Sequence, residues 1–354
     1  MQKLLFRILF IVFVFAPFSE SGAQSAELTT FTNPLLPSGA DPFSFYKDGY
    51  YYYMHTSGSR LVLRKTKSIA ELATAEKKII FEPESGKSWS KELWAPEIHY
   101  IKGKWYVYFA ADDGDNKNHR MFVLQNSSED PMKGEWVFKG KIADRSDKWA
   151  IDGSILDYRG KLYMVWAGWE KDVNGQQDIY IARMKNPVKI KGKRVRISSP
   201  VYEWERNGNL PGEVSHVSVN EGPQPLMNKD KLFLIYSASG CWTDFYALGM
   251  LTFTGRKNLL DSAAWVKSPN PVFQQSPENA VYGPGHNSFF KSPDGTEDWI
   301  LYHANPRPGD GCGGNRSPRA QKFTWKADGS PDFGMPVKTG VPLPVPSDKR
   351  ELKN

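Results

Sequence analysis

The chain has 354 residues, of which 40% are hydrophobic and 14% aromatic, and its net charge is +7. This length is sufficient for a large hydrophobic core. No nucleic-acid-binding motif accompanies the positive charge, so we expect no nucleic acid partner. No segment is long and apolar enough to cross a membrane.

Residues 1–23 have the pattern of a secretory signal peptide. Lys3 and Arg7 precede an apolar run over residues 8–18, and small residues at 21–23 form a cleavage site. We therefore expect an exported protein, periplasmic or extracellular, that begins near Gln24. Residues 24–341 are expected to form a single domain, and the proline-rich, charged segment 342–354 a C-terminal tail that is either a closing segment or a loose end.

A hairpin-like unit occurs five times along the chain. Each copy has a short run, a turn, and a strand rich in aromatic and β-branched residues, which is the pattern of a β-hairpin. The copies start at residues 41, 95, 152, 221 and 286, at successive intervals of 54, 57, 69 and 65 residues. A further short strand follows each hairpin. A near-constant repeat of this length indicates a repeat architecture.

The repeat predicts an all-β fold, a five-bladed β-propeller with roughly four antiparallel strands per blade. A β-sandwich also has short strands separated by turns. It gives no reason, however, for one hairpin to return at regular intervals. The segment 189–196, with alternating basic residues, is best explained as a lysine-protected edge strand, although attraction to an acidic polysaccharide is an alternative.

Inner strands of a propeller line its central channel, so residues at equivalent strand starts should meet at one mouth. These residues are Asp41, Glu97, Asp152, Glu221 and His286. Burial and like charge disfavour ionisation, so both raise the pKa of a carboxyl group in a shared apolar site. Carboxyl groups with unlike surroundings in that site then have unlike pKa values. One protonated and one ionised carboxyl group are what glycoside hydrolysis requires.

Several tryptophans lie near these positions and are candidates for a wall on which a sugar stacks. Each of them is also explained as core filler, and Trp166 in particular alternates as a strand residue does. Trp94, directly before a predicted channel position, is the preferred candidate. The full set is Trp94, Trp149, Trp166, Trp169 and Trp242.

The two cysteines, Cys241 and Cys312, are in loops that follow the aromatic strands of adjacent units. In an exported chain this placement favours a disulfide between neighbouring blades, and two free thiols are the alternative. The sequence Asp112-Asp-Gly-Asp-Asn116 has calcium-loop character but lacks the downstream bidentate glutamate. We interpret it as a solvated turn.

Together these motifs resemble glycoside hydrolase family 43, whose members are five-bladed propellers, over residues 33–337. No single motif is specific, but five of them in order are. The motifs are Ala40-Asp-Pro-Phe43, Leu93-Trp-Ala-Pro-Glu-Ile-His99, Ala150-Ile-Asp-Gly-Ser154, Glu221-Gly-Pro223 and Tyr282-Gly-Pro-Gly-His-Asn-Ser288.

The resemblance implies a role for each site residue. Asp41 matches the general base, Asp152 the aspartate that tunes and orients the acid, and Glu221 the general acid of an inverting mechanism, in which base and acid stand roughly 6.5 to 9.5 Å apart. His286 matches a channel histidine that often holds calcium in relatives. Arg319 matches an arginine that binds the sugar, with Trp94 and Trp149 as further substrate-binding candidates.

Within the family, the motif at 93–99 and the late segments from Arg319 and Ala327 are most similar to exo-acting α-L-arabinofuranosidases. The expected substrate is terminal α-L-arabinofuranose on arabinan or arabinoxylan. The chain is expected to act as a monomer without an organic cofactor, and calcium is the candidate ion for its channel. Alternatives are the same machinery acting on β-D-galactofuranosides or β-D-xylosides, a non-catalytic sugar-binding propeller, and a structural interaction propeller.

Overall fold

The computed structural model describes residues 29–209 and 217–348. The predicted signal peptide lies outside the described residues. Within them the regular structure consists of strands and short 3₁₀ turns, and no helix has the length and apolar character needed to cross a membrane. The 3₁₀ turns are η1 (Ile69–Glu71), η2 (Asn116–Asn118), η3 (Glu203–Glu205), η4 (Ser262–Ala264) and η5 (Pro277–Asn279).

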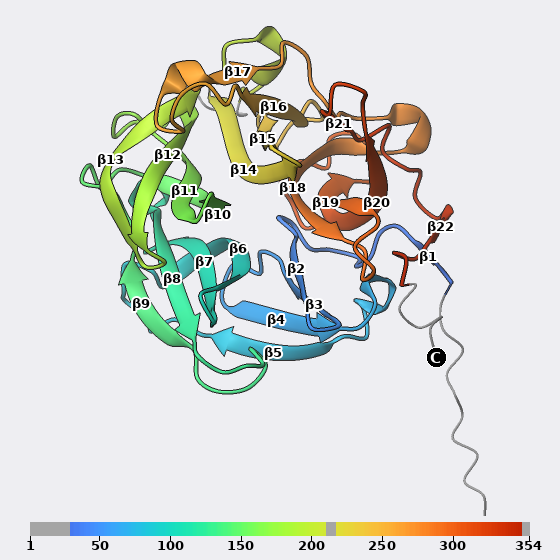
Figure 1. Ribbon diagram of the computed structural model, residues 1–354, viewed down its shortest axis with the longest axis horizontal. Helices are drawn as coiled ribbons and strands as arrows, with labels where there is room; N and C mark the ends of the chain where they lie inside the picture. Colours follow the sequence, from blue (N-terminus) through green and yellow to red (C-terminus); the bar gives the residue numbers. More distant parts are fainter. Residues whose placement is uncertain (1–28, 210–216, 349–354) are drawn as a thin grey trace, which may run out of the picture.

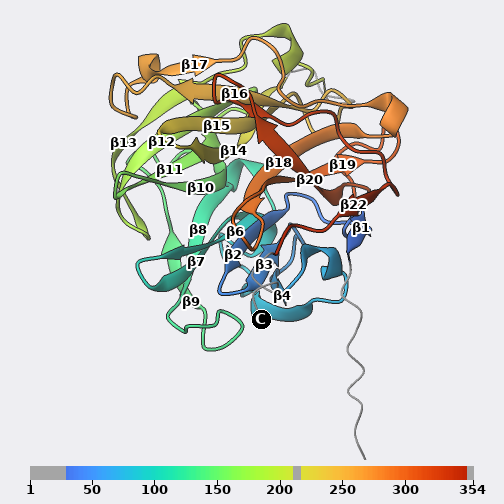
Figure 2. The ribbon, with the colours of Figure 1, turned by 45° about the vertical axis from the view of Figure 1, so that its right-hand side comes forward.

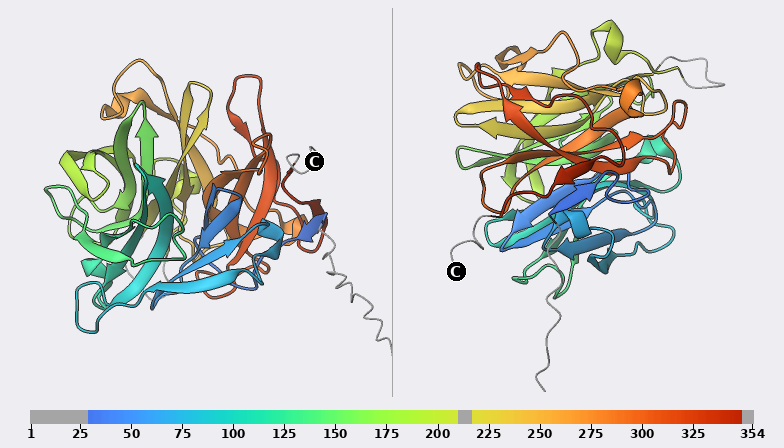
Figure 3. Two further views of the ribbon diagram at one scale, coloured as in Figure 1. Left: turned by 60° about the horizontal axis from the view of Figure 1, so that its bottom comes forward. Right: turned by 90° about the vertical axis from the view of Figure 1, so that its right-hand side faces the viewer.

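Three four-stranded antiparallel sheets and one eight-stranded sheet surround a common axis (Figure 1). The eight-stranded sheet consists of two four-stranded antiparallel blades that are joined by a short parallel pairing of residues 176–177 with 218–219. Each blade runs from an inner to an outer strand in chain order, and Figure 3 shows the sheets from two further sides. The predicted five-bladed propeller is thus confirmed. Blade 1 is β2 (Phe43–Lys47), β3 (Tyr50–Met54), β4 (Leu61–Thr66) and β5 (Glu76–Phe81); blade 2 is β6 (Lys91–Ile101), β7 (Lys104–Asp112), β8 (Arg120–Asn126) and β9 (Val137–Lys141); blade 3 is β10 (Ala150–Tyr158), β11 (Lys161–Gly168), β12 (Gln176–Asn186) and β13 (Lys189–Ser198); blade 4 is β14 (Ser218–Asn228), β15 (Lys231–Ala238), β16 (Ala247–Phe253) and β17 (Trp265–Lys267); blade 5 is β18 (Tyr282–Lys291), β19 (Asp298–Asn305), β20 (Ser317–Trp325) and β21 (Pro331–Asp332).

Both faces of each middle strand are buried between neighbouring blades, which explains the nearly continuous apolar runs. On β7, Trp105 and Val107 join a core cluster shared with blade 1, whereas the alternating Tyr106 and Tyr108 join a cluster shared with blade 3. Successive side chains of a strand point to opposite faces. A strand whose successive side chains enter two apolar cores in turn must be apolar at every position, so these strands lack a polar side.

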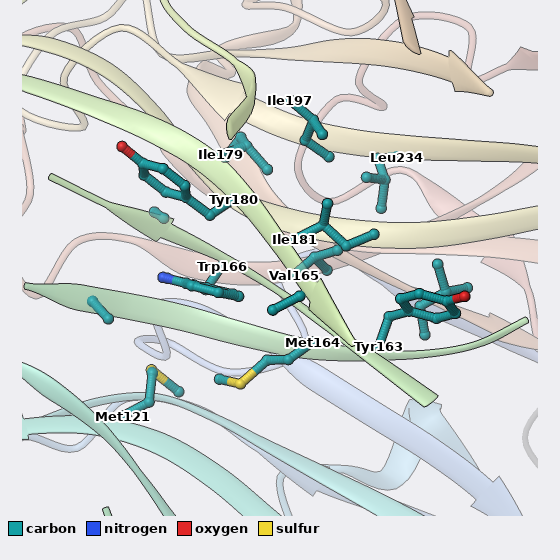
Figure 4. Packing of buried hydrophobic residues seen from close by; sticks show 14 of the residues in the cluster. Met121, Tyr163, Met164, Val165, Trp166, Ile179, Tyr180, Ile181, Ile197 and Leu234 are labelled. Carbon is teal, nitrogen blue, oxygen red and sulfur yellow. The ribbon is translucent and has the colours of Figure 1, made fainter. Parts of the chain in front are cut away.

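The largest core cluster joins blades 2, 3 and 4 (Figure 4). Met121 comes from blade 2, Met164 and Trp166 from blade 3, and Leu234 from blade 4. The ring of Trp166 stacks on that of Tyr180, with centroids 6.0 Å apart. Trp166 is therefore part of the core, as the alternating pattern of its strand indicated. It does not belong to a sugar-binding wall.

The inner strands begin with residues in the left-handed region of backbone space. Asp41, Ala95, Asp152 and Gly222 have φ values of 57°, 42°, 56° and 55°, and His286 in blade 5 has 46°. The pairing register shifts at the starts of β6, β10, β14 and β18. Such bulges bend a strand and redirect its side chains. Each blade thus has a left-handed residue at or near the start of its inner strand, and in blades 2 to 5 a bulge accompanies it.

Segments from the two ends of the described chain close the ring. Strand β1 (Thr30–Thr32) pairs with β22 (Pro342–Pro344) beside blade 5 (Figure 2). Asn33, which is buried, donates from Nδ2 to the carbonyl of Ala320 and accepts from its N–H through Oδ1, both at 2.9 Å. Ser347 also hydrogen-bonds to Asp294. Residues 342–347 are therefore a closing segment, and the folded body extends beyond the predicted boundary at 341.

Replacement of Asn33 by Ala should loosen this closure. Two buried backbone groups of Ala320 would lose their partners, which should lower the free energy of unfolding by about 2–4 kcal/mol. Chemical denaturation measures the change. Thr32→Ala, at an exposed position of the same strand, is the control and should change stability by about 0.5 kcal/mol or less. Equal effects of the two substitutions would contradict a specific role for Asn33.

Candidate active site

A cavity of about 480 Å³ opens at the centre of the ring. Four of the five predicted residues, Asp41, Asp152, Glu221 and His286, line it together. Glu97 does not. It accepts a hydrogen bond from Gln224 and contacts His99 instead. The left-handed position of blade 2 is Ala95, two residues before Glu97, so the blade presents a methyl group where blades 1 and 3 present a carboxylate.

Asp41 is held by basic and hydroxyl groups from four other segments. Thr56 Oγ1 donates to its Oδ2 at 2.6 Å, whereas His286 Nδ1 and Arg316 Nη1 lie 3.2 and 3.4 Å from its Oδ1. The Asp41 N–H donates to His303 Nδ1 at 3.0 Å. Burial alone raises the pKa of Asp41, but the surrounding His286, Arg316 and His303 hold it well below its usual range. Asp41 is therefore ionised.

Glu221, near the start of β14, lies in the opposite electrostatic setting. Among the described residues, its hydrogen-bond donor is Tyr246, whose Oη donates to Oε1 at 2.8 Å. Burial, reinforced by the negative charge of Asp152, raises the pKa of Glu221 to about 8. Gly285 allows this contact, because a Cβ at that position would lie 2.1 Å from the Tyr246 ring. Glu221 is thus protonated at neutral pH.

Asp152 links the acid segment to the rest of the cavity. Its Oδ2 accepts a hydrogen bond from the N–H of Gly222, the residue after Glu221, at 3.0 Å. Burial raises the pKa of Asp152 to about 6, although His286 opposes the shift. Besides the exposed Glu92, the cavity is therefore lined by three buried carboxyl groups with a low, an intermediate and a high pKa.

His286 is oriented by its neighbours in the cavity. The backbone N–H of His286 donates to Ser237 Oγ at 2.7 Å, and the Nδ1 atom of its ring lies 3.2 Å from Asp41 Oδ1. Burial alone lowers the pKa of His286, but Asp41, Asp152 and Glu221 together raise it. When protonated, His286 balances part of the negative charge of Asp41 and Asp152.

The residues around His286 do not fit a calcium site. Calcium takes six to eight oxygen ligands, whereas the Nδ1 atom of His286 already faces Asp41. No group of three or more metal-binding His, Cys, Asp or Glu side chains occurs within residues 29–209 and 217–348. The chemistry of the site is therefore derived without a metal ion.

Two walls of different composition enclose the carboxyl groups. Trp94 and Trp149 line one side, from blade 2 and from the start of blade 3. Trp242 and Arg316 line the other side, together with Cys241 and Cys312. Trp94, Trp149 and Trp242 were sequence candidates for a sugar-binding wall, whereas Arg316 was not. Trp169 stacks face to face behind Trp149, with centroids 4.4 Å apart, and is not among the lining residues.

Cys241 and Cys312 form a disulfide with Cα atoms 5.2 Å apart. It joins the loop after β15 in blade 4 to the loop after β19 in blade 5. The Gly309 N–H also donates to the Asp244 carboxylate at 2.9 Å, which ties the same two loops a second time. These bonds fix one side of the cavity mouth.

The structure does not bring Arg319 to the cavity. Arg319 is 1% exposed and pairs with Tyr302 across strands β19 and β20. Paired residues share a face of the sheet, and Tyr302 packs on Phe273 in the core between blades. Arg316 is the arginine that lines the cavity and contacts Asp41. It precedes β20, in the loop that the disulfide anchors.

Sequence analysis missed the residues that set the environment of the acids. Thr56, Tyr246 and His303 lie after β3, just before β16 and on β19, outside the inner strands that the repeat identified. Arg316 lies four residues after Cys312, in the same loop. The available signal was position: Thr56 and His303 are near the end of the second strand of a blade, and Tyr246 and Arg316 directly precede the third strand.

Comparison with known proteins agrees with this geometry. The model of the family described as Glycosyl hydrolases family 43 matches residues 31–331. The chain belongs to this family.

Its relatives include the extracellular exo-α-(1→5)-L-arabinofuranosidase of Streptomyces avermitilis, with 40% identity over 327 residues, 90% of this chain and 66% of that protein. The chain thus spans just under two thirds of that relative. The α-L-arabinofuranosidase 43 of Humicola insolens is 36% identical over 95% of this chain and 69% of its own length. The crystal structure of α-L-arabinofuranosidase from Lactobacillus brevis superposes with a TM-score of 0.80 at 37% identity, covering 88% of this chain and 98% of that one.

Replacement of Tyr246 by Phe should raise the pH at which the glycosidase activity of this family 43 chain declines. The Tyr246 hydroxyl donates to the Glu221 carboxylate and so stabilises its ionised form. Without this bond the pKa of Glu221 should rise further above about 8. The alkaline decline of kcat/KM should then occur at higher pH. Tyr106→Phe, at a buried tyrosine outside the cavity lining, should leave it unmoved, and a downward shift for Tyr246→Phe would contradict the assignment.

Proposed function

We propose that the chain is an inverting, exo-acting α-L-arabinofuranosidase that releases terminal arabinofuranose from arabinan or arabinoxylan. The observation that carries the proposal is the unlike state of the buried carboxyl groups: Asp41 is ionised, and Glu221 is protonated at neutral pH. An inverting glycosidase needs one carboxylate to activate water and one acid to protonate the leaving oxygen.

Asp41 is the proposed general base. Its low pKa keeps it ionised throughout the neutral range, and its contacts with Thr56, His286 and Arg316 fix the carboxylate. A water molecule that donates a proton to Asp41 becomes a better nucleophile toward the anomeric carbon. The positive charges that fix Asp41 also limit its basicity, so its main contribution is to orient the water.

Glu221 is the proposed general acid. A carboxylic acid with a pKa of about 8 is protonated at pH 7 and can transfer its proton to the glycosidic oxygen as the bond to the anomeric carbon breaks. Once Glu221 is ionised, Tyr246 stabilises it by hydrogen bonding. Asp152 acts through Glu221, because its charge raises the pKa of the acid and its bond to the Gly222 N–H orients the acid segment.

The sugar specificity is proposed from the relatives and from the cavity. The S. avermitilis and H. insolens proteins bear the names of arabinofuranosidases. Trp94 and Trp149 provide aromatic surface on one side of the cavity, and sugars stack on such surface. A β-galactofuranosidase or β-xylosidase would use the same three carboxyl groups, and a panel of nitrophenyl glycosides distinguishes these activities. A non-catalytic sugar-binding protein would not need carboxyl groups of unlike pKa.

We further propose that the protein is exported and acts as a monomer on its polysaccharide substrate. The disulfide between Cys241 and Cys312 supports an oxidising compartment. The catalytic residues come from one chain, so the proposed reaction requires no second subunit.

Glu221→Gln and Asp41→Asn should separate the two catalytic roles. Loss of the acid should reduce hydrolysis of arabino-oligosaccharides by about 10²–10⁴-fold but reduce hydrolysis of nitrophenyl arabinofuranoside much less, because nitrophenolate leaves without a proton. Loss of the base should affect both substrates. Steady-state kinetics on the two substrates measure this difference.

Asp48→Asn is the matched control for Asp41→Asn. Asp48 also has a left-handed backbone, with φ of 52°, but its side chain is exposed and outside the cavity. Asn tolerates this backbone region, so both variants should fold. Equal loss on the two substrates in Glu221→Gln would contradict its role as the acid.

The anomeric configuration of the product tests inversion. Proton NMR recorded during hydrolysis should show β-arabinofuranose first, followed by mutarotation. An initial α product would indicate retention and would require a nucleophilic carboxylate close to the acid.

A further inference from the structure

A buried His–Asp pair lies behind the tryptophan side of the cavity. His119 is 0% exposed and Asp112 is 1% exposed, and the Nδ1 atom of His119 lies 3.0 Å from Asp112 Oδ2. Neither residue lines the cavity, and the proposed hydrolysis does not use either of them. Burying this pair costs solvation free energy, so its role needs an explanation.

The imidazole of His119 is held at both nitrogens. Its Nε2 lies 3.2 Å from the carbonyl oxygen of Glu92, opposite to the contact with Asp112. Asp112 is itself fixed, because its Oδ1 accepts from the N–H of Gly114 at 2.9 Å. The ring therefore has a single orientation, set by segments on both sides of β7.

His119 presents its ring to the tryptophans of the cavity wall. The ring stacks beneath Trp94, with centroids 4.0 Å apart and an interplanar angle of 26°. Its edge contacts Trp149, at a centroid distance of 6.3 Å. Trp94 and Trp149 both line the cavity. Trp94 is only partly buried, so its other face remains available to a ligand.

We propose that His119 and Asp112 are positioning residues that hold Trp94 in the orientation in which it stacks on the substrate sugar. The inference rests on the proposed function, since it assumes that a sugar occupies the cavity. Asp112 fixes the imidazole, the imidazole backs the indole, and the indole contacts the sugar. Neither Asp112 nor His119 touches the substrate.

The physical advantage of this arrangement is preorganisation. Fixing a side chain only when a ligand binds costs conformational entropy, which weakens binding. A Trp94 ring that is already fixed by a rigid ring at 4.0 Å avoids this cost. The effect should therefore appear as tighter substrate binding and not as faster chemistry. If the pair were only part of the core, its loss would lower stability without acting through Trp94.

A double-mutant cycle between His119 and Trp94 tests the proposal. Trp94→Ala, His119→Ala and the double variant are compared with the wild type by steady-state kinetics on an arabino-oligosaccharide. We expect Trp94→Ala to raise KM about tenfold and His119→Ala to raise it about three- to tenfold, as expected for loss of an aromatic contact and of its preorganisation. In the Trp94→Ala background, His119→Ala should change KM by less than about twofold. The kcat values should stay close to wild type.

Asp112→Asn provides a second variant that keeps the shape of the pair if His119→Ala does not fold. It should raise KM by a smaller factor, again only when Trp94 is present. Phe138→Ala is the stability control, because Phe138 stacks on Trp89 at 4.8 Å and neither residue lines the cavity. It should lower the melting temperature without changing KM.

The outcomes distinguish failure of the inference from failure of the proposed function. If Trp94→Ala hydrolyses the substrate with unchanged KM, the proposed sugar contact of Trp94 is wrong, and the positioning role is overturned with it. If Trp94→Ala raises KM but His119→Ala does not, or raises it equally in both backgrounds, only the positioning role is overturned. A wild-type chain without glycosidase activity would overturn the proposed function itself.

Discussion

Burial of three carboxyl groups in one cavity is the constraint on which the site depends. Burial and mutual repulsion raise the pKa of each group, and the protein compensates them unequally. Among the described residues, Asp41 has Thr56, Arg316 and two histidines around it, whereas Glu221 has a hydrogen bond from Tyr246 and a weaker influence of His286. This difference keeps one group ionised and one protonated at the same pH. The proposed acid–base roles thus follow from the placement of neighbours on other blades.

Rotational repetition of a local distortion places these groups. A left-handed residue lies at or near the start of each inner strand, with a bulge beside it in blades 2 to 5, and this geometry brings Asp41 and Asp152 to the cavity. A left-handed non-glycine residue costs about 1–2 kcal/mol, and aspartate is among the residues that adopt this region most readily. Asp41 and Asp152 occupy such positions. The backbone geometry that forms the cavity mouth therefore favours the residue type that the chemistry needs there.

The two walls of the cavity are supported by different means. On one side, Trp94 and Trp149 contact a buried His119 that Asp112 holds. On the other side, a disulfide and a backbone bond to Asp244 join loops of blades 4 and 5. Both supports are outside the inner strands. The family 43 scaffold thus fixes the acids through its blades and the cavity mouth through its loops.

The sequence by itself determined the number of blades, the three acids, His286 and the position of the cysteines, because these depend on local hairpin patterns that repeat at regular intervals. The tertiary structure decided which side chains reach the cavity and which residues from distant parts of the chain contact one another. Arg316 and not Arg319 reaches the cavity because strand alternation turns Arg319 into the core. Glu97 lies outside the cavity lining because the bulge of blade 2 falls on Ala95. Asp112 belongs to an apparent surface turn and becomes functionally interesting only where folding places His119 against it. Pairings of this kind depend on side-chain direction and on contacts between blades, and neither leaves a periodic signal in the sequence.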